Sequence, residues 1–311
     1  GQSLAAISAS VFTHLDPILT NFQPDWVLVV GDTTTVVTTS QLAYYHRIKL
    51  GHVEAGLRTH NKWHPFPEEI NRRIATVIAD LHFAPTEWSK GNLLREGVDE
   101  KNILVTGNSV IDALNFVAKQ EEPEEITSLL HQLGTSEPET KTLVLVTAHR
   151  RENFGQPLEN ICLAIKELAS CGDLEIVYPV HLNPKVQEPV NRILKGMPHI
   201  TLLPPLDYRP MVHLMKHAKL ILTDSGGLQE EAPSLGVPVL VLRETTERPE
   251  GVEAGTLKLV GTETSHIVRQ AKQLLEDPIA YAEMAKATNP YGDGHAAERI
   301  VNALTNVPHQ V

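Results

Sequence analysis

Short runs of apolar residues alternate with segments in which apolar residues recur every three or four positions. This recurrence predicts a helix over residues 1–22, with its apolar residues on one face. The unbroken apolar run 26–30 predicts a buried strand, and helical spacing resumes over residues 35–47. The alternation of strands and helices then continues through the rest of the chain.

Further strands are predicted by apolar runs at 51–53, 81–84, 103–106, 142–147, 175–180, 200–203, 220–223, 238–242 and 256–260. Helical patterns between them cover 67–79, 87–96, 109–119, 158–168, 184–194, 211–217 and 263–275, and another helix follows residue 225. Regular alternation of this kind is typical of parallel sheets with helices on both faces.

The charged segment 121–141 interrupts the alternation and has little periodicity. We interpret its beginning as a junction, because a chain of 311 residues is long enough to form two cores. The sequence therefore predicts an α/β protein of two Rossmann-like domains with a cleft between them. The first domain would cover residues 1–120 and the second residues 121–288.

The composition limits the possible partners. A formal net charge of −11 argues against nucleic acid or an anionic membrane as the main partner. No apolar run approaches the roughly 20 residues of a membrane span, and no signal peptide opens the chain. The two cysteines, Cys162 and Cys171, lack metal-site spacing and indicate a reducing cytosol. The scattered histidines predict no metal site, and the lack of a G-x-G-x-x-G or Walker-type loop disfavours nicotinamide and ATP chemistry.

Polar residues stand where several predicted strands end. Asp32 follows one strand, Glu54 another, His149 a third and Asp224-Ser225 a fourth. Ligands of parallel α/β sheets bind beyond the carboxyl ends of the strands. We therefore interpret these residues as lining a ligand site.

The segment 220–233 joins an apolar strand to a helix through Ser225, Gly226 and Gly227. The first turn of a helix has unpaired N–H donors and a positive dipole end, and glycine lets an anion approach the backbone. A phosphate site is one interpretation of this segment, and a plain tight turn is the other. Glu231, about one and a half turns into the helix, could reach a ribose diol.

Three carboxylates of the first half could converge on one wall of the cleft, namely Asp32, Glu54 and Glu68. Their repulsion would raise at least one pKa towards neutrality, which provides both a proton donor and a proton acceptor. Simpler interpretations stay open. They are a helix cap at Asp32 or Thr33, an ion pair between Glu54 and Arg58, and helix-dipole matching for Glu68 and, more strongly, Glu69.

A cationic turn follows the strand at 142–147. It carries His149, Arg150 and Arg151, which suit a departing phosphate because negative charge grows on it as its bond breaks. Arginines on a solvated loop are the ordinary interpretation, but the histidine at the strand end favours the phosphate. Arg248 lies among glutamates and could either clamp a diphosphate or be held in a structural ion pair.

Together these segments resemble one family, the non-hydrolysing UDP-N-acetylglucosamine 2-epimerases of the GT-B fold. The matching strings are 31–35, 52–59, 67–72, 149–152, 181–184, 224–233, 245–249 and 289–294, which run in order through nearly the whole chain. The resemblance implies reversible C2 epimerisation of UDP-GlcNAc to UDP-ManNAc for bacterial cell-surface polysaccharides. UDP would be eliminated to leave a glycal and would then add back. The resemblance also implies no cofactor and no metal, a cytoplasmic homodimer, and a tail 289–311 that crosses back onto the first domain as a helix.

The resemblance implies roles for individual residues as well. Asp32, Glu54 and Glu68 would form the acid–base set, and His149 would assist the departing phosphate. Substrate-binding residues would be Arg58, Arg72, Leu206, Met211, Ser225, Gly226, Gly227, Glu231 and Arg248, with the loop 206–211 covering uracil mainly through its backbone. His181 would contact substrate bound at a regulatory site beside the active site.

One feature of the family is missing from the chain. The Gly-Thr-Arg-Pro-Glu string of the family's first strand does not occur, which indicates that on the order of 60 residues of the first domain are absent. We therefore expect an incomplete first domain and poor activity unless another segment supplies this part. The alternative hypotheses are a GT-B glycosyltransferase or hydrolysing relative, and a UDP-sugar-binding protein without catalysis.

Overall fold

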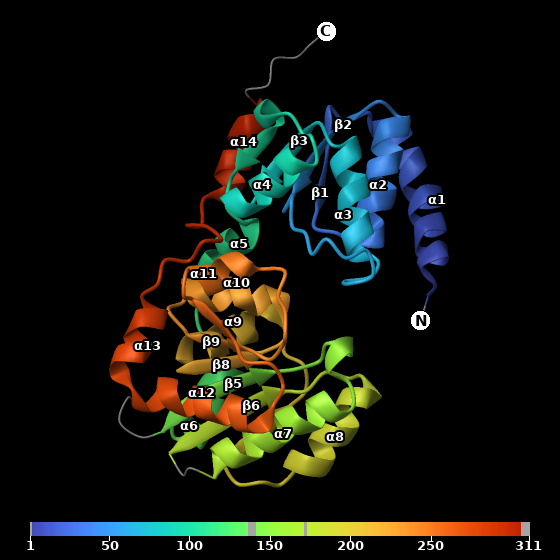
Figure 1. The fold of residues 1–311 in the computed structure, drawn as a ribbon. Coiled ribbons are helices and arrows are strands. Elements are labelled where there is room, and N and C mark those ends of the chain that lie inside the picture. The colour runs from blue at the N-terminus through green and yellow to red at the C-terminus, as the bar shows by residue number, and fades with distance from the viewer. Residues whose placement is uncertain (1, 136–140, 171–172, 306–311) are drawn as a thin grey trace. The chain divides into compact units, whose positions relative to one another are not determined.

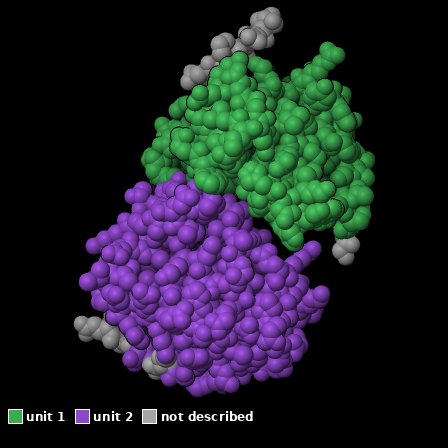
Figure 2. Space-filling view, viewed as in Figure 1, with its two compact units in different colours: residues 1–112, 291–311 green, residues 113–290 purple. Residues whose placement is uncertain are grey.

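The computed structural model describes residues 2–135, 141–170 and 173–305, and the chain divides into two compact units (Figure 2). Unit 1 consists of residues 1–112 and 291–311, and unit 2 of residues 113–290. The division falls within helix α5 (Ser109–Ala118), upstream of the charged segment in which the sequence predicts the junction. Each unit contains one parallel sheet with helices packed on it, so the predicted α/β class is confirmed (Figure 1).

Unit 1 is built on a four-stranded parallel sheet with the strand order β1-β2-β3-β4. Its strands are β1 (Trp26–Val30), β2 (Lys49–Val53), β3 (Leu81–Ala84) and β4 (Ile103–Val105). Its helices are α1 (Leu4–Phe22), α2 (Thr34–Tyr45), α3 (Glu68–Ile78), α4 (Glu87–Arg95) and α14 (Ala296–Thr305), with a 3-10 turn at Glu100–Asn102. Val29 and Leu50 pack with residues of α2 and α3, whereas Val53 and Phe83 pack with Ile300 of α14. Helices α2 and α3 therefore cover one face of the sheet, and α14 covers part of the other. On that second face Leu28 and Val30 of β1 are exposed, whereas a parallel sheet is usually covered on both faces.

The last helix of unit 1 comes from the far end of the chain. The chain re-enters unit 1 at Tyr291, and α14 follows. The Asp112 carboxylate accepts hydrogen bonds from the backbone N–H groups of Ala296 at 3.1 Å and Ala297 at 2.9 Å. A carboxylate at the N-terminus of a helix satisfies free donors and faces the positive end of the dipole. Asp112 thus anchors the C-terminal helix to the first segment of unit 1.

Unit 2 is built on a six-stranded parallel sheet with the strand order β10-β9-β8-β5-β6-β7. Its strands are β5 (Thr142–Thr147), β6 (Leu174–Pro179), β7 (Ile200–Leu203), β8 (Leu220–Thr223), β9 (Val239–Val241) and β10 (Leu257–Leu259). Its helices are α6 (Glu124–Leu133), α7 (Gln156–Ala169), α8 (Pro184–Leu194), α9 (Tyr208–His217), α10 (Gly226–Ser234), α11 (Pro249–Glu253), α12 (Thr264–Glu276) and α13 (Pro278–Ala285), with a 3-10 turn at Arg151–Asn153.

The central strand β5 shows why this sheet is buried on both faces. Val144 and Val146 lie in one apolar cluster, and Leu143 and Leu145 lie in the other. Successive side chains of a strand point to opposite faces, so an unbroken apolar run supplies both clusters at once. This is the pattern from which the strand was predicted.

Three helices of unit 2 were not predicted, and one of them lies in the segment 121–141, whose sequence has little periodicity. Helix α6 occupies Glu124–Leu133, and α11 and α13 are short helices that begin with proline. In α6 only Ile126 and Leu130 are buried, four residues apart, among polar neighbours. So narrow an apolar face gives a weak periodic signal. The segment 136–140 lies outside the described residues.

Within residues 2–135, 141–170 and 173–305, no helix has the length and apolar character needed to cross a membrane.

Candidate functional site

In unit 1 the first candidate residues lie at the carboxyl ends of neighbouring strands. The register pairs Val30 of β1 with Val53 of β2, and Gly31 donates its backbone N–H to the Val53 carbonyl at 3.1 Å. Glu54 follows with a φ of +64°, a left-handed backbone that is costly for a residue other than glycine. A Cβ on Gly31 would lie 3.1 Å from Glu54 Oε2. The sheet thus directs this carboxylate towards the turn that carries Asp32.

Helix α3 holds Asp32 through two residues. Arg72 donates to Asp32 Oδ2 from Nε at 2.9 Å and from Nη2 at 2.6 Å, and the Asn71 amide donates to the Asp32 carbonyl at 2.8 Å. The alternative role of Asp32 as a helix cap is not observed, because Thr33 caps α2 by accepting from Val36 N–H. Arg72 is therefore bound to a candidate catalytic carboxylate, and its predicted contact with substrate stays a prediction.

The two acids that begin α3 have different surroundings. Glu69 is fully buried and accepts backbone N–H groups from Thr59 at 3.0 Å and His60 at 3.1 Å. Helix-dipole matching alone therefore does not explain Glu69, because its carboxylate ties the loop after β2 to α3. Glu68 is half-buried, and it lies one turn before Arg72 on α3. Residues four apart share a helix face, which places Glu68 on the side of α3 that contacts Asp32.

Arg58 is bound to other protein side chains rather than accessible to a ligand. Its side chain has no exposed surface, and it donates to Glu96 at 2.9 and 2.7 Å and to Thr76 Oγ1 at 2.8 Å. The ion-pair interpretation named Glu54 as the partner, but the partner is Glu96, at the end of α4. These contacts argue against the predicted role of Arg58 in binding substrate.

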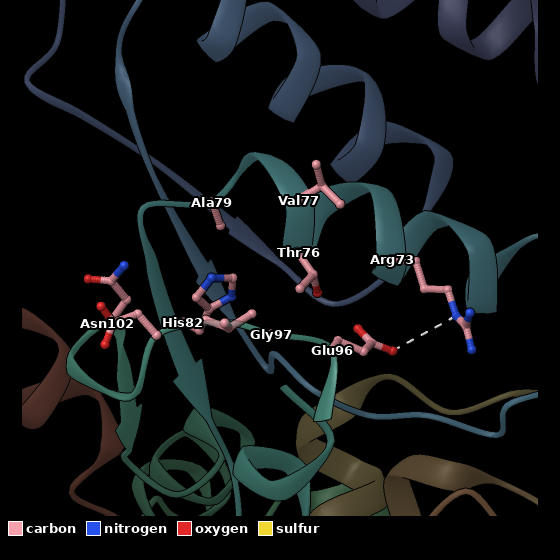
Figure 3. Close-up of a pocket in the computed structure, with 10 residues that line it drawn as sticks. Arg73, Thr76, Val77, Ala79, His82, Glu96, Gly97 and Asn102 are labelled. Carbon is pink, nitrogen blue, oxygen red and sulfur yellow. Dashed lines mark ion pairs between the residues drawn. The ribbon is translucent and has the colours of Figure 1, made fainter. Parts of the chain in front are cut away.

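A pocket of about 460 Å³ lies at the other edge of the unit 1 sheet (Figure 3). It is lined by Arg73, Thr76, Val77, Ala79, His82, Glu96, Gly97, Val98, Asp99 and Asn102. Ala79 lies two residues before β3 and Asn102 one residue before β4, whereas Asp32 and Glu54 follow the ends of β1 and β2. Because all these strands are parallel, the pocket opens at the opposite edge from the candidate carboxylates.

In unit 2 the strands β5 and β8 bring His149 and Asp224 together. They pair in register at Thr147 and Thr223. Asp224 is fully buried, and its Oδ2 accepts hydrogen bonds from His149 N–H at 2.8 Å, Arg150 N–H at 2.8 Å and the Asn153 amide at 2.9 Å. Its other oxygen, Oδ1, lies 3.8 Å from His149 Nδ1 and has no hydrogen-bond partner among the described residues.

The His149 ring is also stacked on a second histidine. Its centroid lies 5.2 Å from that of His181, with 12° between the ring planes. Burial lowers the pKa of His149 below its ordinary value, the Asp224 carboxylate acts in the opposite direction, and His181 and Arg150 lower it further. The proposed regulatory role of His181 stays a prediction, but its ring does contact the candidate catalytic histidine.

The glycine-containing turn predicted from the sequence begins α10. Ser225 is the N-cap residue, but its side chain makes no capping hydrogen bond. A Cβ on Gly226 would lie 2.6 Å from Arg248 Nη1, whereas a Cβ on Gly227 would meet nothing nearer than Glu231 Oε2 at 3.7 Å. Gly226 therefore allows the close approach of Arg248 to the helix end.

The Arg248 side chain is almost completely buried between two glutamates. It donates to Glu230 Oε1 from Nε and to Glu247 Oε1 from Nη1. Burial alone would raise the pKa of Glu247, but the charges of Arg248 and Arg243 outweigh it and lower this pKa to about 2. Of the two interpretations left open, the structural ion pair is observed, and the contact with diphosphate stays a prediction.

The candidate ribose ligand Glu231 has a partner that the sequence did not reveal. Tyr208 donates its hydroxyl to Glu231 Oε1 at 2.6 Å, while burial raises the pKa of this glutamate. The side chains of Leu206 and Met211, at either side of the start of α9, pack onto the apolar core. Because these two side chains face the core, a ligand beside the loop 206–211 would contact the loop mainly through its backbone.

No group of three or more histidine, cysteine, aspartate or glutamate side chains suited to a metal ion occurs in the described part of the chain.

Known proteins resemble this chain throughout its length. Residues 1–305 match the family described as UDP-N-acetylglucosamine 2-epimerase. The enzyme of that name from Yersinia pestis is 54% identical over 100% of this chain and 83% of its own length. The Escherichia coli K12 enzyme is 53% identical over 98% of this chain and 82% of its own length.

Solved structures agree with the sequence comparison. The UDP-GlcNAc 2-epimerase of Neisseria meningitidis bound to UDP-GlcNAc superimposes with a TM-score of 0.90 at 48% identity, covering 98% of this chain and 83% of that one. MnaA from S. aureus in complex with UDP has a TM-score of 0.91 at 46% identity, covering 98% and 82%. These relatives have the GT-B arrangement of two parallel α/β domains. With about half of its residues identical over nearly its whole length, the chain belongs to the UDP-N-acetylglucosamine 2-epimerase family.

Proposed function

We propose that this chain catalyses the reversible C2 epimerisation of UDP-GlcNAc to UDP-ManNAc, without a cofactor. The observation that carries the proposal is the 54% identity to a UDP-N-acetylglucosamine 2-epimerase over the full chain. The candidate groups support it, because proton transfer at C2 needs carboxylates and departure of UDP needs groups that bind phosphate. A product of this kind suits the synthesis of bacterial surface polysaccharides.

Unit 1 supplies the proton-transfer groups in this proposal. One carboxylate of Asp32, Glu54 and Glu68 removes the C2 proton while the C1–O bond to UDP breaks and the electron pair forms the C1–C2 double bond of a glycal. UDP then adds back to C1, and another carboxylic acid of the set gives a proton to the opposite face of C2. The Arg72 guanidinium, 2.6 Å from Asp32, offsets the charge of one member, so the set need not carry three uncompensated charges.

Unit 2 supplies the groups for the departing diphosphate. The first turn of α10 presents backbone N–H groups that the side chain of its N-cap residue, Ser225, does not cap. His149 donates a hydrogen bond or a proton to the phosphate oxygen as its charge grows. Glu231, held by Tyr208, accepts the ribose hydroxyls. The resemblance implies these roles, and the structure adds the residues that contact some of these groups, such as Tyr208 beside Glu231.

Incubation of UDP-GlcNAc with the protein in D₂O tests the proposal. We expect NMR to show UDP-ManNAc as the product. It should also show deuterium at C2 of both UDP-GlcNAc and UDP-ManNAc, because the proton abstracted from C2 exchanges with solvent. UDP release without deuterium at C2 would instead indicate a hydrolysing or transferring enzyme. UDP binding without any turnover would indicate a binding protein, and either result would reject epimerisation by this chain.

We also propose a homodimer in the cytosol. The described cysteine, Cys162, is unpaired and buried, and burial raises the pKa of its thiol to about 12, so this thiol is unreactive. Cys171 lies outside the described residues. Sedimentation equilibrium of the purified chain tests the dimer, and a single species at the monomer mass of 34.3 kDa would reject it.

A further inference from the structure

We propose that Asp224 is the positioning residue of His149, which it orients through Nδ1 so that Nε2 is the nitrogen presented to the departing phosphate. This inference rests on the proposed function, in which His149 assists that phosphate. Asp224 does not need to touch the substrate for this role. It acts through the histidine alone.

The position of Asp224 is fixed from three directions. Its Oδ2 accepts two backbone N–H groups and one side-chain amide, from His149, Arg150 and Asn153, at 2.8 to 2.9 Å. The amide of Asn153 also donates to the Leu242 carbonyl at 3.1 Å, which connects the network to the residue after β9. A carboxylate held in this way cannot turn away from the histidine without losing several hydrogen bonds.

The other oxygen of Asp224 points to a function. Oδ1 is buried, and the part of the chain that the structure describes gives it no hydrogen-bond partner, which is rare because leaving a buried carboxylate oxygen unpaired is costly. His149 Nδ1 lies 3.8 Å away, within ion-pair distance and slightly beyond a hydrogen bond. Hydrogen bonds of this type are often long without substrate and shorten in the substrate complex.

Asp224 also supplies a negative charge beside the ring of His149. His181 stacks on the ring from the end of β6, and Arg150 follows in the chain, so both oppose a positive charge on His149. The Asp224 carboxylate favours that charge. A carboxylate at Nδ1 fixes the tautomer and stabilises the imidazolium, as in other histidine–carboxylate pairs.

The test is substitution of Asp224 with asparagine. In D224N the amide oxygen can still accept the three N–H groups, while the charge that faces Nδ1 is removed. We expect the pKa of His149, measured by NMR of histidine-labelled protein without substrate and assigned with H149Q, to fall. We expect kcat for epimerisation to fall about 10- to 100-fold with a much smaller change in KM.

E175Q is the matched control. Glu175 is a buried carboxylate of the same unit that pairs with Lys141 and His199 rather than with His149. We expect E175Q to leave both the His149 titration and kcat unchanged. A folded D224N protein with an unchanged His149 titration would overturn the proposal, even if its activity were low.

A measurement on the unaltered protein covers the case in which D224N does not fold. Above its pKa, His149 should carry its proton on Nδ1, which ¹⁵N chemical shifts distinguish from Nε2. A neutral ring protonated on Nε2 would overturn the proposal. Both NMR measurements are made without substrate, so failure of the D₂O experiment would reject the proposed function separately from the positioning role.

Discussion

The two units hold their candidate carboxylates in different ways. In unit 1 the strand-end carboxylate Asp32 is bound by a cation, Arg72, and the same unit contains the ion pair of Arg58 and Glu96. In unit 2 the buried Asp224 is held by two backbone N–H groups and an amide, and no cation binds its Oδ2 among the contacts of the described residues. A guanidinium partner offsets charge, whereas backbone partners fix geometry. Substitutions at the Asp32 pair of unit 1 should therefore change mainly the charge of the site. Substitutions around Asp224 of unit 2 should change mainly the orientation of the side chains that it contacts.

The largest effect is expected at Glu54. E54Q keeps the shape of the side chain but removes the proton-transfer group, so we expect epimerisation to fall by about 10²- to 10⁴-fold. UDP affinity, measured by isothermal titration calorimetry, should change little. E87Q, at an exposed position at the start of α4, is the control and should retain full activity. An active E54Q enzyme would remove Glu54 from the acid–base set.

The buried pair of Arg58 and Glu96 should dominate the stability of unit 1. R58M removes the hydrogen-bonded cation of Glu96 and leaves only Arg73 at 4.0 Å among the described ion pairs, and breaking a buried pair costs about 3 kcal/mol. All tryptophans of the chain, at positions 26, 63 and 88, belong to unit 1, so urea unfolding followed by tryptophan fluorescence reports on this unit. K101M, which breaks an exposed pair with Asp99, should cost less than about 0.5 kcal/mol. Equal effects of the two substitutions would contradict the structural role of Arg58.

The two glycines of α10 allow a sharper test in unit 2. G226A would place a methyl group 2.6 Å from Arg248 Nη1, so we expect a loss of about 1 to 3 kcal/mol in stability. G227A has an ordinary contact distance of 3.7 Å and should not reduce stability. If phosphate binds at this helix end, G227A should still weaken UDP binding by about tenfold, or roughly 1.4 kcal/mol. Thermal unfolding and calorimetry separate the two effects, and wild-type UDP affinity in G227A would reject this phosphate site.

A further effect is a pH dependence of stability in unit 1, which is absent at neutral pH. Burial lowers the pKa of His52 and of His82 to about 4 from an ordinary value of 6.5. Between these values the unfolded chain binds protons that the folded chain excludes, so stability should be full above pH 6.5 and fall as the pH drops towards 4. Each histidine contributes up to about 1.4 kcal/mol per pH unit.

Tryptophan fluorescence in urea at several pH values measures this slope. H82Q should reduce it, because one of the two titrating groups is removed. An H82Q slope equal to that of the wild type would show that His82 does not contribute.

The sequence allowed prediction of the strands and of the polar residues at their ends. Strand β5 was predictable because its apolar run fills both faces of the sheet, and His149 was a candidate because it follows that strand. The partners of the candidate residues were not predictable. Arg58 binds Glu96, 38 residues away, and His149 meets Asp224, 75 residues away, and neither spacing follows from a local pattern.

The contact of Tyr208 with Glu231 was likewise not predictable from the sequence. It lies 23 residues from Glu231, and nothing in its own segment distinguishes it from any other tyrosine near the start of a helix. A glycine pattern, by contrast, is local, which is why the turn at Gly226 could be recognised. Its specific reason, the approach of Arg248, appears only in three dimensions.

The packing of the C-terminal helix α14 into unit 1 affects the order in which the units can fold during synthesis. Ile300 contributes to a core whose other buried members, Val53 and Phe83, leave the ribosome more than 200 residues earlier. Unit 2 is encoded entirely between these parts. Unit 1 should therefore complete its packing after unit 2, although most of unit 1 is synthesised first. Loss of the chain after residue 290 should expose Phe83 and leave the sheet of unit 2 intact.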